Sequence, residues 1–105
     1  MGRSAQRKGA DGERELANLL KEYGFAVRRG QVFNHESDMV GLDKIHPEVK
    51  RVEKLNVPAA MKQAITEAQI RHDGTPTLFH RRSREEWLVT MRLTDWIELY
   101  RKWNT

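Results

Sequence analysis

The sequence contains no cysteine. Disulfide bonds, zinc–thiolate sites and cysteine nucleophiles are therefore excluded, and any metal ion must be bound by oxygen or imidazole ligands. Long apolar runs are also missing: no stretch approaches the roughly 20 residues that cross a bilayer, and the N-terminus lacks the apolar segment of a signal peptide. We therefore expect a cytoplasmic protein with no membrane contact.

The chain is also too short for two domains, since 105 residues suit a single small core. Hydrophobic residues make up 38% of the sequence and charged residues 32%, a balance typical of globular proteins rather than of disordered ones. We predict a basic flexible arm over residues 1–10, followed by one domain over residues 11–105.

Acidic residues are outnumbered by basic ones: 15 Asp and Glu against 19 Lys and Arg give a net charge of +4. A positive chain gains affinity for polyanions by displacing counterions from phosphate. The basic residues lie in separate clusters before the first acid, at residues 28–29 and at residues 81–84. This distribution favours a surface that follows a nucleic-acid backbone over a single basic tail.

The apolar spacing predicts an alternation of helices and strands. We expect a helix capped by Asp11 and ended by Gly24, strands over residues 25–29, 38–42 and 45–52, a helix from Val57 to about Gly74, strands over residues 77–80 and 87–93, and a last helix capped by Thr94 or Asp95. The second and third strands are predicted to form an antiparallel hairpin. The order indicates an α/β domain whose mixed sheet is flanked by helices.

Glu48 and Lys50 lie two residues apart in a predicted strand, so their side chains project from the same face. Asp38 starts the preceding strand, and the expected hairpin would bring its carboxylate close to that of Glu48. Two carboxylates and the carbonyl of Val49 would suit a hard divalent cation such as Mg²⁺. Such a cation can acidify water and polarise a phosphate, while Lys50 offsets developing charge. The alternative is an ordinary solvated strand face.

Glu13 lies at the edge of the apolar stripe of the first predicted helix, beside Leu16 and Leu20. An acid at that position can face inward, toward the sheet. The alternative is a first-turn glutamate that the helix dipole favours, and Glu15 could then play the same part.

Four motifs together resemble the archaeal-type Holliday junction resolvases and their phage relatives. They are Arg7-Lys8-Gly9 with the following Gly12 to Leu16, Gly24-Phe25 with Val27 and Arg28, Asp38-Met39-Val40, and Glu48-Val49-Lys50-Arg51. The resemblance covers residues 7 to about 70, and the phage-type relatives are also similar around residues 87–90. It implies the restriction-endonuclease-like PD-(D/E)XK fold, an α/β fold with a mixed sheet flanked by helices.

The resemblance also implies site residues. The catalytic set would be Glu13, Asp38, Glu48, Lys50 and Gln63, with Mg²⁺, or Mn²⁺ as a substitute, bound by Asp38, Glu48, Glu13 and the carbonyl of Val49. Gln63 lies off the apolar stripe of its helix, so a solvent-facing glutamine is the alternative there. We expect DNA contacts from Arg7, Lys8, Arg14, Arg28, Arg29, His35 and Arg51, with solvated charges as the alternative for one or two of the arginines.

The chain departs from the family pattern in two places. Ser37 replaces the proline of the family name, and residues 31–36 replace the expected Ser-Gly of the preceding loop. The first change is tolerable because that proline shapes a turn and binds nothing, whereas the second bears on substrate specificity. His46, His72 and His80 show no metal-ligand spacing and are expected to be structural or exposed.

We therefore expect a Mg²⁺-dependent endonuclease that makes paired nicks in branched DNA as a homodimer. The alternatives are a nicking or repair nuclease on duplex, flap or single-stranded DNA, and a basic DNA-binding module without activity. An aromatic stripe in the last helix, made by Trp96, Leu99, Tyr100 and Trp103, is predicted to cover the sheet, with a dimer interface as the alternative.

Overall fold

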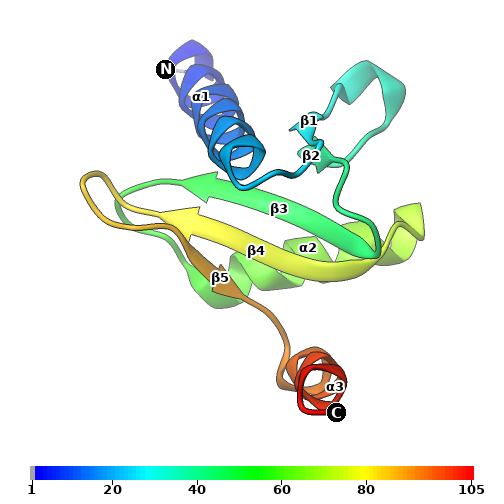
Figure 1. Cartoon of the computed structure of the whole chain (residues 1–105). Coiled ribbons are helices and arrows are strands. Elements are labelled where there is room, and N and C mark those ends of the chain that lie inside the picture. The colour runs from blue at the N-terminus through cyan, green and yellow to red at the C-terminus, as the bar shows by residue number, and fades with distance from the viewer. Residues whose placement is uncertain (1) are drawn as a thin grey trace.

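The computed structural model describes residues 2–105, with the side chains of residues 2–8 and 32 left outside the description. Along the chain the elements are α1 (Gly2–Glu22), β1 (Arg28–Arg29), the 3-10 helix η1 (Val32–Asn34), β2 (Met39–Val40), β3 (Ile45–Arg51), α2 (Val57–Arg71), β4 (Thr75–Arg81), β5 (Leu88–Thr90) and α3 (Leu93–Trp103). Figure 1 shows their arrangement, with α1 and α2 on opposite faces of the larger sheet. This order confirms the predicted α/β class.

The larger sheet has the strand order β3-β4-β5, in which β4 pairs parallel to β3 and antiparallel to β5. It is therefore a mixed sheet, as predicted. The parallel pairing follows from the connection, because α2 carries the chain back across the sheet between β3 and β4. Its register places Glu48 beside Leu78 and Val49 beside Phe79.

The hairpin predicted between residues 38–42 and 45–52 is wrong. β2 pairs antiparallel with β1, where Arg29 lies opposite Met39, and β3 pairs with β4 instead. The backbone of Gly41 explains the choice: it has a φ of 114°, and a Cβ there would lie 2.3 Å from the carbonyl oxygen of Ala26. The end of β2 is thus held against the segment that leads into β1.

α1 begins at Gly2, well before the predicted cap at Asp11. The segment predicted as a flexible arm therefore has helical backbone from Gly2 on. Asp11 lies inside the helix and forms an ion pair with Arg14 over 3.1 Å. The predicted stop at Gly24 is confirmed, because this residue has a φ of 97° and its N–H donates to the carbonyl of Lys21.

Two apolar clusters fill the faces of the larger sheet. The α1 side contains Leu16, Ala17, Val27, Met39 and Val49, and the α2 side contains Ala60, Met61 and Leu78. α2 follows its prediction closely: the side chain of Asn56 caps its start, and it ends at a left-handed His72 shortly before Gly74. Because neighbouring strand residues alternate between the faces, Val49 enters the α1 cluster while Glu48 and Leu78 face α2.

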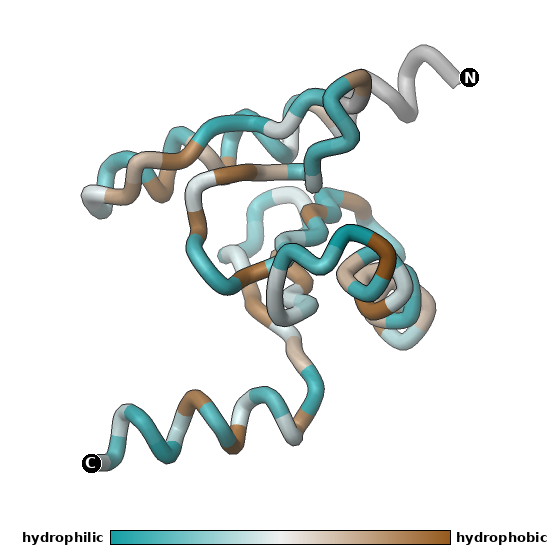
Figure 2. The backbone as a smooth tube through the Cα atoms, turned by 90° about the vertical axis from the view of Figure 1, so that its right-hand side faces the viewer, coloured by the Kyte–Doolittle hydropathy of each residue, from teal (hydrophilic) through white to brown (hydrophobic). Residues whose placement is uncertain are grey.

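α3 does not cover the sheet, so that prediction is wrong. None of its residues is buried, and the helix projects away from the rest of the chain (Figures 1 and 2). Trp96 and Trp103 are 47% and 80% exposed. The helix starts after Arg92, so Thr94 and Asp95 lie inside it and neither caps it as predicted. The backbone of Arg92 is extended and connects β5 to the helix. Among the described residues, no helix is both long and apolar enough to cross a membrane.

Candidate metal centre

β3 presents three polar side chains on one face. His46, Glu48 and Lys50 alternate with Pro47 and Val49, as the period of a strand requires. Glu48 is 1% exposed and His46 fully buried, while Lys50 is partly exposed. The sheet therefore places a buried carboxyl group next to a lysine that reaches solvent.

Asp38 reaches this strand through its side chain rather than through a hairpin. Its Oδ2 accepts a hydrogen bond of 2.8 Å from the backbone N–H of Val49. Its own carbonyl accepts one of 2.9 Å from the N–H of Gly30. Ser37 occupies the position of the proline in the PD-(D/E)XK motif. Its hydroxyl donates to Oδ2 of Asp73 over 2.5 Å. These bonds fix the start of β2 beside the middle of β3.

Glu13 approaches from α1. Its Oε1 accepts a hydrogen bond of 2.8 Å from Nε of Arg29, and its side chain is 17% exposed. The helix can lie close because Gly12 rests against β3: a Cβ at Gly12 would lie only 2.9 Å from Cβ of Arg51. The prediction that Glu13 faces the sheet is thus met by its position.

One cleft of about 460 Å³ collects these residues. It is lined by Gly9, Glu13, Glu36, Asp38, Glu48, Val49, Lys50, Arg51, Val52, Gln63, Glu67 and Arg71. Gln63 is exposed yet lines this cleft, and its Nε2 lies 3.4 Å from Oε1 of Glu67. The structure therefore brings together the five residues predicted as catalytic, including the glutamine whose direction the helix pattern left open.

The acids of the cleft have raised pKa values. Burial, together with the charges of Asp38 and Glu67, raises the pKa of Glu48 to about 8. Burial likewise raises the pKa of Asp38, although the hydrogen bond from Val49 opposes this. Burial also raises the pKa of Glu13 against the opposing hydrogen bond from Arg29. Each acid would ionise more readily beside a positive charge.

A divalent cation fits this donor set. Oε2 of Glu48 is buried and has no hydrogen-bond partner among the described residues. Such an atom is costly to bury unless something positive meets it. Oxygen ligands from carboxylates are also the ones that Mg²⁺ and Mn²⁺ accept. Asp38 and Glu48 could hold the ion, and the ligand roles of these two residues, of Glu13 and of the carbonyl of Val49 remain predictions.

Two further groups near Glu48 were missed in the sequence. His46 and Glu67 each place a ligand atom within 4.8 Å of the other and of Glu48. His46 was expected to be structural or exposed because the histidines of the sequence show no metal-ligand spacing, and Glu67 lies on the next helix. The available signal was the alternation of β3, which puts His46 on the same face as Glu48.

Most of the arginines predicted to contact DNA are in ion pairs. Arg28 binds Glu36 over 2.6 Å, Arg29 binds Glu13, Arg51 binds Glu15 over 3.4 Å, and Arg14 binds Asp11. His35 has a φ of 56°, and its carbonyl accepts a hydrogen bond from Arg71. The side chains of Arg7 and Lys8 lie outside the described residues. The DNA contacts therefore stay predictions.

Glu15 has a different place from Glu13. Its carboxylate accepts hydrogen bonds from Nε of Arg81 over 2.6 Å and from Nε1 of Trp87 over 3.1 Å, in addition to its ion pair with Arg51. The Arg81 bond lowers the pKa of Glu15. Glu15 thus ties α1 to β3, β4 and the connection to β5, and it is not among the residues that line the cleft.

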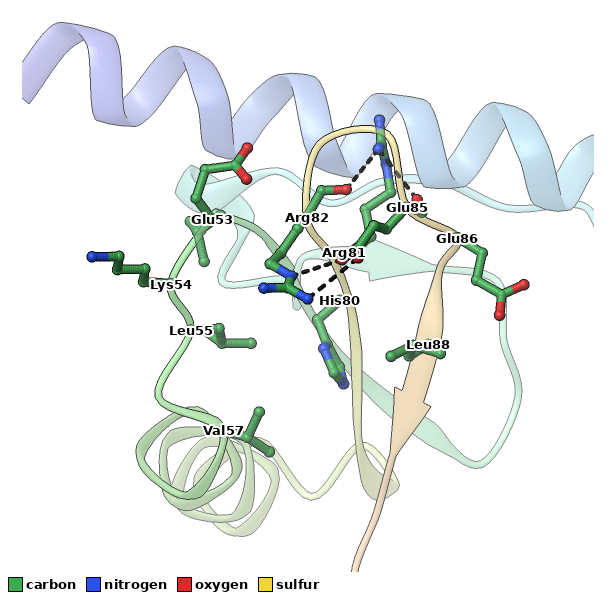
Figure 3. A pocket seen from close by; sticks show the side chains of 11 residues that line it. Glu53, Lys54, Leu55, Val57, His80, Arg81, Arg82, Glu85, Glu86 and Leu88 are labelled. Carbon is green, nitrogen blue, oxygen red and sulfur yellow. Dashed lines mark hydrogen bonds and ion pairs between the residues drawn. The ribbon is translucent and has the colours of Figure 1, made fainter.

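The arginine-rich turn lines a separate cavity of about 630 Å³ (Figure 3). Arg82 pairs with Glu85 over 2.7 Å, and Arg81 donates to the carbonyl of Arg82 as well as to Glu15. Leu55, Val57 and Leu88 form apolar parts of its wall. This cavity is larger than the cleft, but the residues predicted as catalytic and the acids with raised pKa values line the cleft and not this cavity.

The close contact of Gly12 with β3 gives a testable prediction. Gly12→Ala should displace α1 from Arg51 and destabilise the protein by roughly 1–3 kcal/mol, the cost of an overpacked contact. Gly9→Ala is the matched control on the same helix, because a Cβ there meets nothing within 4 Å. It should stabilise by about 0.5–1 kcal/mol through helix propensity. Urea unfolding of both variants measures this, and effects of the same sign would contradict the close contact.

A family model described as archaeal Holliday junction resolvase matches residues 4–98. The match runs from α1 into α3 and includes every residue that lines the cleft. No curated protein matches the chain.

Proposed function

This chain belongs to the archaeal Holliday junction resolvase family, and from that premise we propose that it is a metal-dependent endonuclease that makes paired nicks in four-way DNA junctions. The observation that carries the proposal is the cleft in which Asp38, Glu48 and Lys50 meet. A protein that only binds DNA gains nothing from buried acids beside a phosphate, because they repel the ligand. A bound divalent cation removes that conflict.

Each residue of the cleft can be given a role. Asp38 and Glu48 would hold Mg²⁺ or Mn²⁺, which when bound supplies Lewis acidity toward the phosphate and water. Lys50 leaves β3 on the same face as Glu48 and would orient the attacking water or offset charge that develops on the phosphate. Gln63, which is exposed and lines the cleft, would position a substrate oxygen. Glu13 would hold α1 and β1 together beside the cleft through its ion pair with Arg29.

The test compares substrates and metals in one assay. Labelled four-way junction, flap, nicked duplex and linear duplex are incubated with the protein and Mg²⁺, Mn²⁺ or EDTA. We expect cleavage of the junction at two symmetric positions with either metal, and none with EDTA. Single uncoupled nicks on duplex or flap DNA would instead favour a nicking or repair nuclease. Binding without cleavage under every metal would overturn the proposal in favour of a non-catalytic module.

Substitution of Glu13 should lower the cleavage rate, whereas substitution of Glu15 should lower the stability of the fold. Glu13→Ala should lower the cleavage rate by roughly a hundredfold, the cost of misplacing an active-site group, with little change in stability. Glu15→Ala should destabilise by roughly 1–3 kcal/mol, because it removes the acceptor of Nε of Arg81 and of Nε1 of Trp87. Single-turnover rates and thermal unfolding of both variants separate the two roles. Equal, mild losses of rate would remove Glu13 from the site.

Paired incision requires two active sites, and each protomer offers one. A two-fold dimer supplies both. The exposed face of α3 is our candidate interface, since Trp96 and Tyr100 stack at 5.1 Å between ring centroids and Trp103 meets Tyr100 edge-on at 5.7 Å. Rigid aromatic side chains of this kind anchor many protein interfaces.

We expect a homodimer at micromolar concentration that binds a four-way junction more tightly than linear duplex of the same length. Trp96→Ser should weaken the dimer by at least about tenfold, because buried aromatic anchors dominate interface energies. Ile70→Ser is the control, since Ile70 is an apolar residue of α2 that is 72% exposed. Sedimentation velocity measures both. A monomer on junction DNA, or equal effects of the two variants, would contradict this interface.

A further inference from the structure

His46 is held in one orientation by a neighbouring acid. The side chain is fully buried in β3, and its Nδ1 lies 2.7 Å from Oδ1 of Asp73. The other oxygen of Asp73 accepts the hydroxyl of Ser37. A carboxylate oxygen accepts hydrogen bonds, so Nδ1 is the donor of this one. In the tautomer with its hydrogen on Nδ1, the ring has its lone pair on Nε2.

Nε2 of His46 points toward other acceptors. It has no hydrogen-bond partner among the described residues, and the same holds for Oε2 of Glu48. The nearest acid of α2 is Glu67, whose Oε2 lies 3.9 Å from Nε2, too far for a hydrogen bond. Three ligand atoms, one each from His46, Glu48 and Glu67, lie within 4.8 Å of one another. Ligand atoms from a strand and a helix thus converge, and neither Nε2 of His46 nor Oε2 of Glu48 has a hydrogen-bond partner among the described residues.

We propose that His46, Glu48 and Glu67 form a second cation site, which takes a transition-metal ion such as Mn²⁺ or Zn²⁺ in preference to Mg²⁺. The proposal deepens the proposed function, because Glu48 would be shared with the cation held by Asp38. An imidazole ligand suits Mn²⁺ and Zn²⁺, whereas Mg²⁺ prefers a shell of oxygen atoms.

The surroundings resemble those of known metal ligands in their chemistry. A ligating histidine usually donates its other ring N–H to a carboxylate, which fixes the tautomer and makes the ring a better ligand. Asp73 stands in that position behind His46. Glu67 is reachable from solvent because its side chain is 34% exposed and lines the cleft. An ion can therefore enter through the cleft and meet Glu67 before the buried ligands.

The first experiment counts bound metal without using activity. Free Mn²⁺ is measured by electron paramagnetic resonance while it is titrated into the protein without DNA. We expect two bound ions per wild-type chain and one per Glu67→Gln chain. Glu22→Gln is the control, since it removes a charge from an exposed residue at the end of α1. Unchanged stoichiometry in Glu67→Gln would overturn the second site.

The second experiment reads the ligand atom directly. In ¹⁵N spectra of the histidine rings, Zn²⁺ should shift Nε2 of His46 while leaving His80, whose Nε2 is bonded to Thr90 over 2.8 Å, in place. Asp73→Asn should weaken the Zn²⁺ affinity by roughly 10- to 100-fold, as loss of an outer carboxylate does. A His46 resonance that Zn²⁺ does not move would show that the ring only supports the fold.

The two proposals can fail separately. If wild-type protein cuts no DNA but the His46 resonance shifts with Zn²⁺ and Glu67→Gln loses one ion, the second site stands and the nuclease does not. If the protein cuts junctions with Mg²⁺ and Glu67→Gln binds as many ions as wild type, the nuclease stands and the second site does not.

Discussion

Asp38→Asn and Glu48→Gln are expected to abolish DNA cleavage while leaving DNA binding intact or stronger. Each change removes a carboxylate that would hold the cation, and it also removes negative charge beside the scissile phosphate. Loss of one strong electrostatic group in an active site costs roughly a hundred- to a thousandfold in rate. Single-turnover cleavage and filter binding on the same junction measure the two effects separately.

Asp43→Asn is the matched control for these variants. Asp43 is exposed in the turn between β2 and β3, so it changes the net charge by the same amount from outside the cleft. It should cleave at the wild-type rate. Wild-type rates in Asp38→Asn or Glu48→Gln, or an equal loss in Asp43→Asn, would place the chemistry elsewhere.

The second large effect concerns stability and pH. The pKa of Glu48 is about 8 in the folded protein, against an ordinary value of 4.5. The folded state therefore holds a proton that the unfolded state releases above pH 4.5. The stability that this proton contributes is fully present below pH 4.5 and is lost as the pH rises to about 8. Metal-free protein should become less stable over that range.

Glu48→Gln should remove this loss, because the amide stays neutral at every pH. At pH 8 without metal the variant should be more stable than wild type by a few kcal/mol. This estimate takes about 1.4 kcal/mol for each unit by which folding shifts the pKa. Adding Mn²⁺ should raise the Tm of wild type far more than that of the variant, since Glu48 is the ligand that both proposed cation sites share. Calorimetric scans from pH 5 to 8 measure this, and parallel curves for the two proteins would contradict it.

Local patterns predicted the helices better than the strand pairing. α2 follows from its apolar spacing and from the stop signals after it, and Gly24 ends α1 as its φ of 97° allows. The predicted hairpin was wrong because strand pairing depends on partners far along the chain. β3 pairs with β4, and α2 connects the two strands. α3 was placed on the sheet from its aromatic stripe, yet that stripe is exposed, since a pattern shows which face is apolar and not what covers it.

The residues of the candidate site also differ in whether the sequence could predict them. Strand alternation placed Glu48 and Lys50 together, and the family resemblance added Glu13, Asp38 and Gln63; all five line one cleft. His46 and Glu67 could not be paired from the sequence, because they come from a strand and the following helix and meet only when α2 packs on the sheet. Spacing in the sequence shows which residues are neighbours within one helix or strand. His46 lies in β3 and Glu67 in α2, so spacing does not bring them together.

The order in which the cleft is assembled has a consequence for protein synthesis. A ribosome releases the N-terminal part first, so the segment with Glu13, Asp38 and Glu48 emerges before α2 and β4 exist. β3 has its hydrogen-bonding partner in β4, and its acids reach their final places only once that strand has left the exit tunnel. The proposed active site is therefore completed by folding, after the segment that carries its first acids has been synthesised.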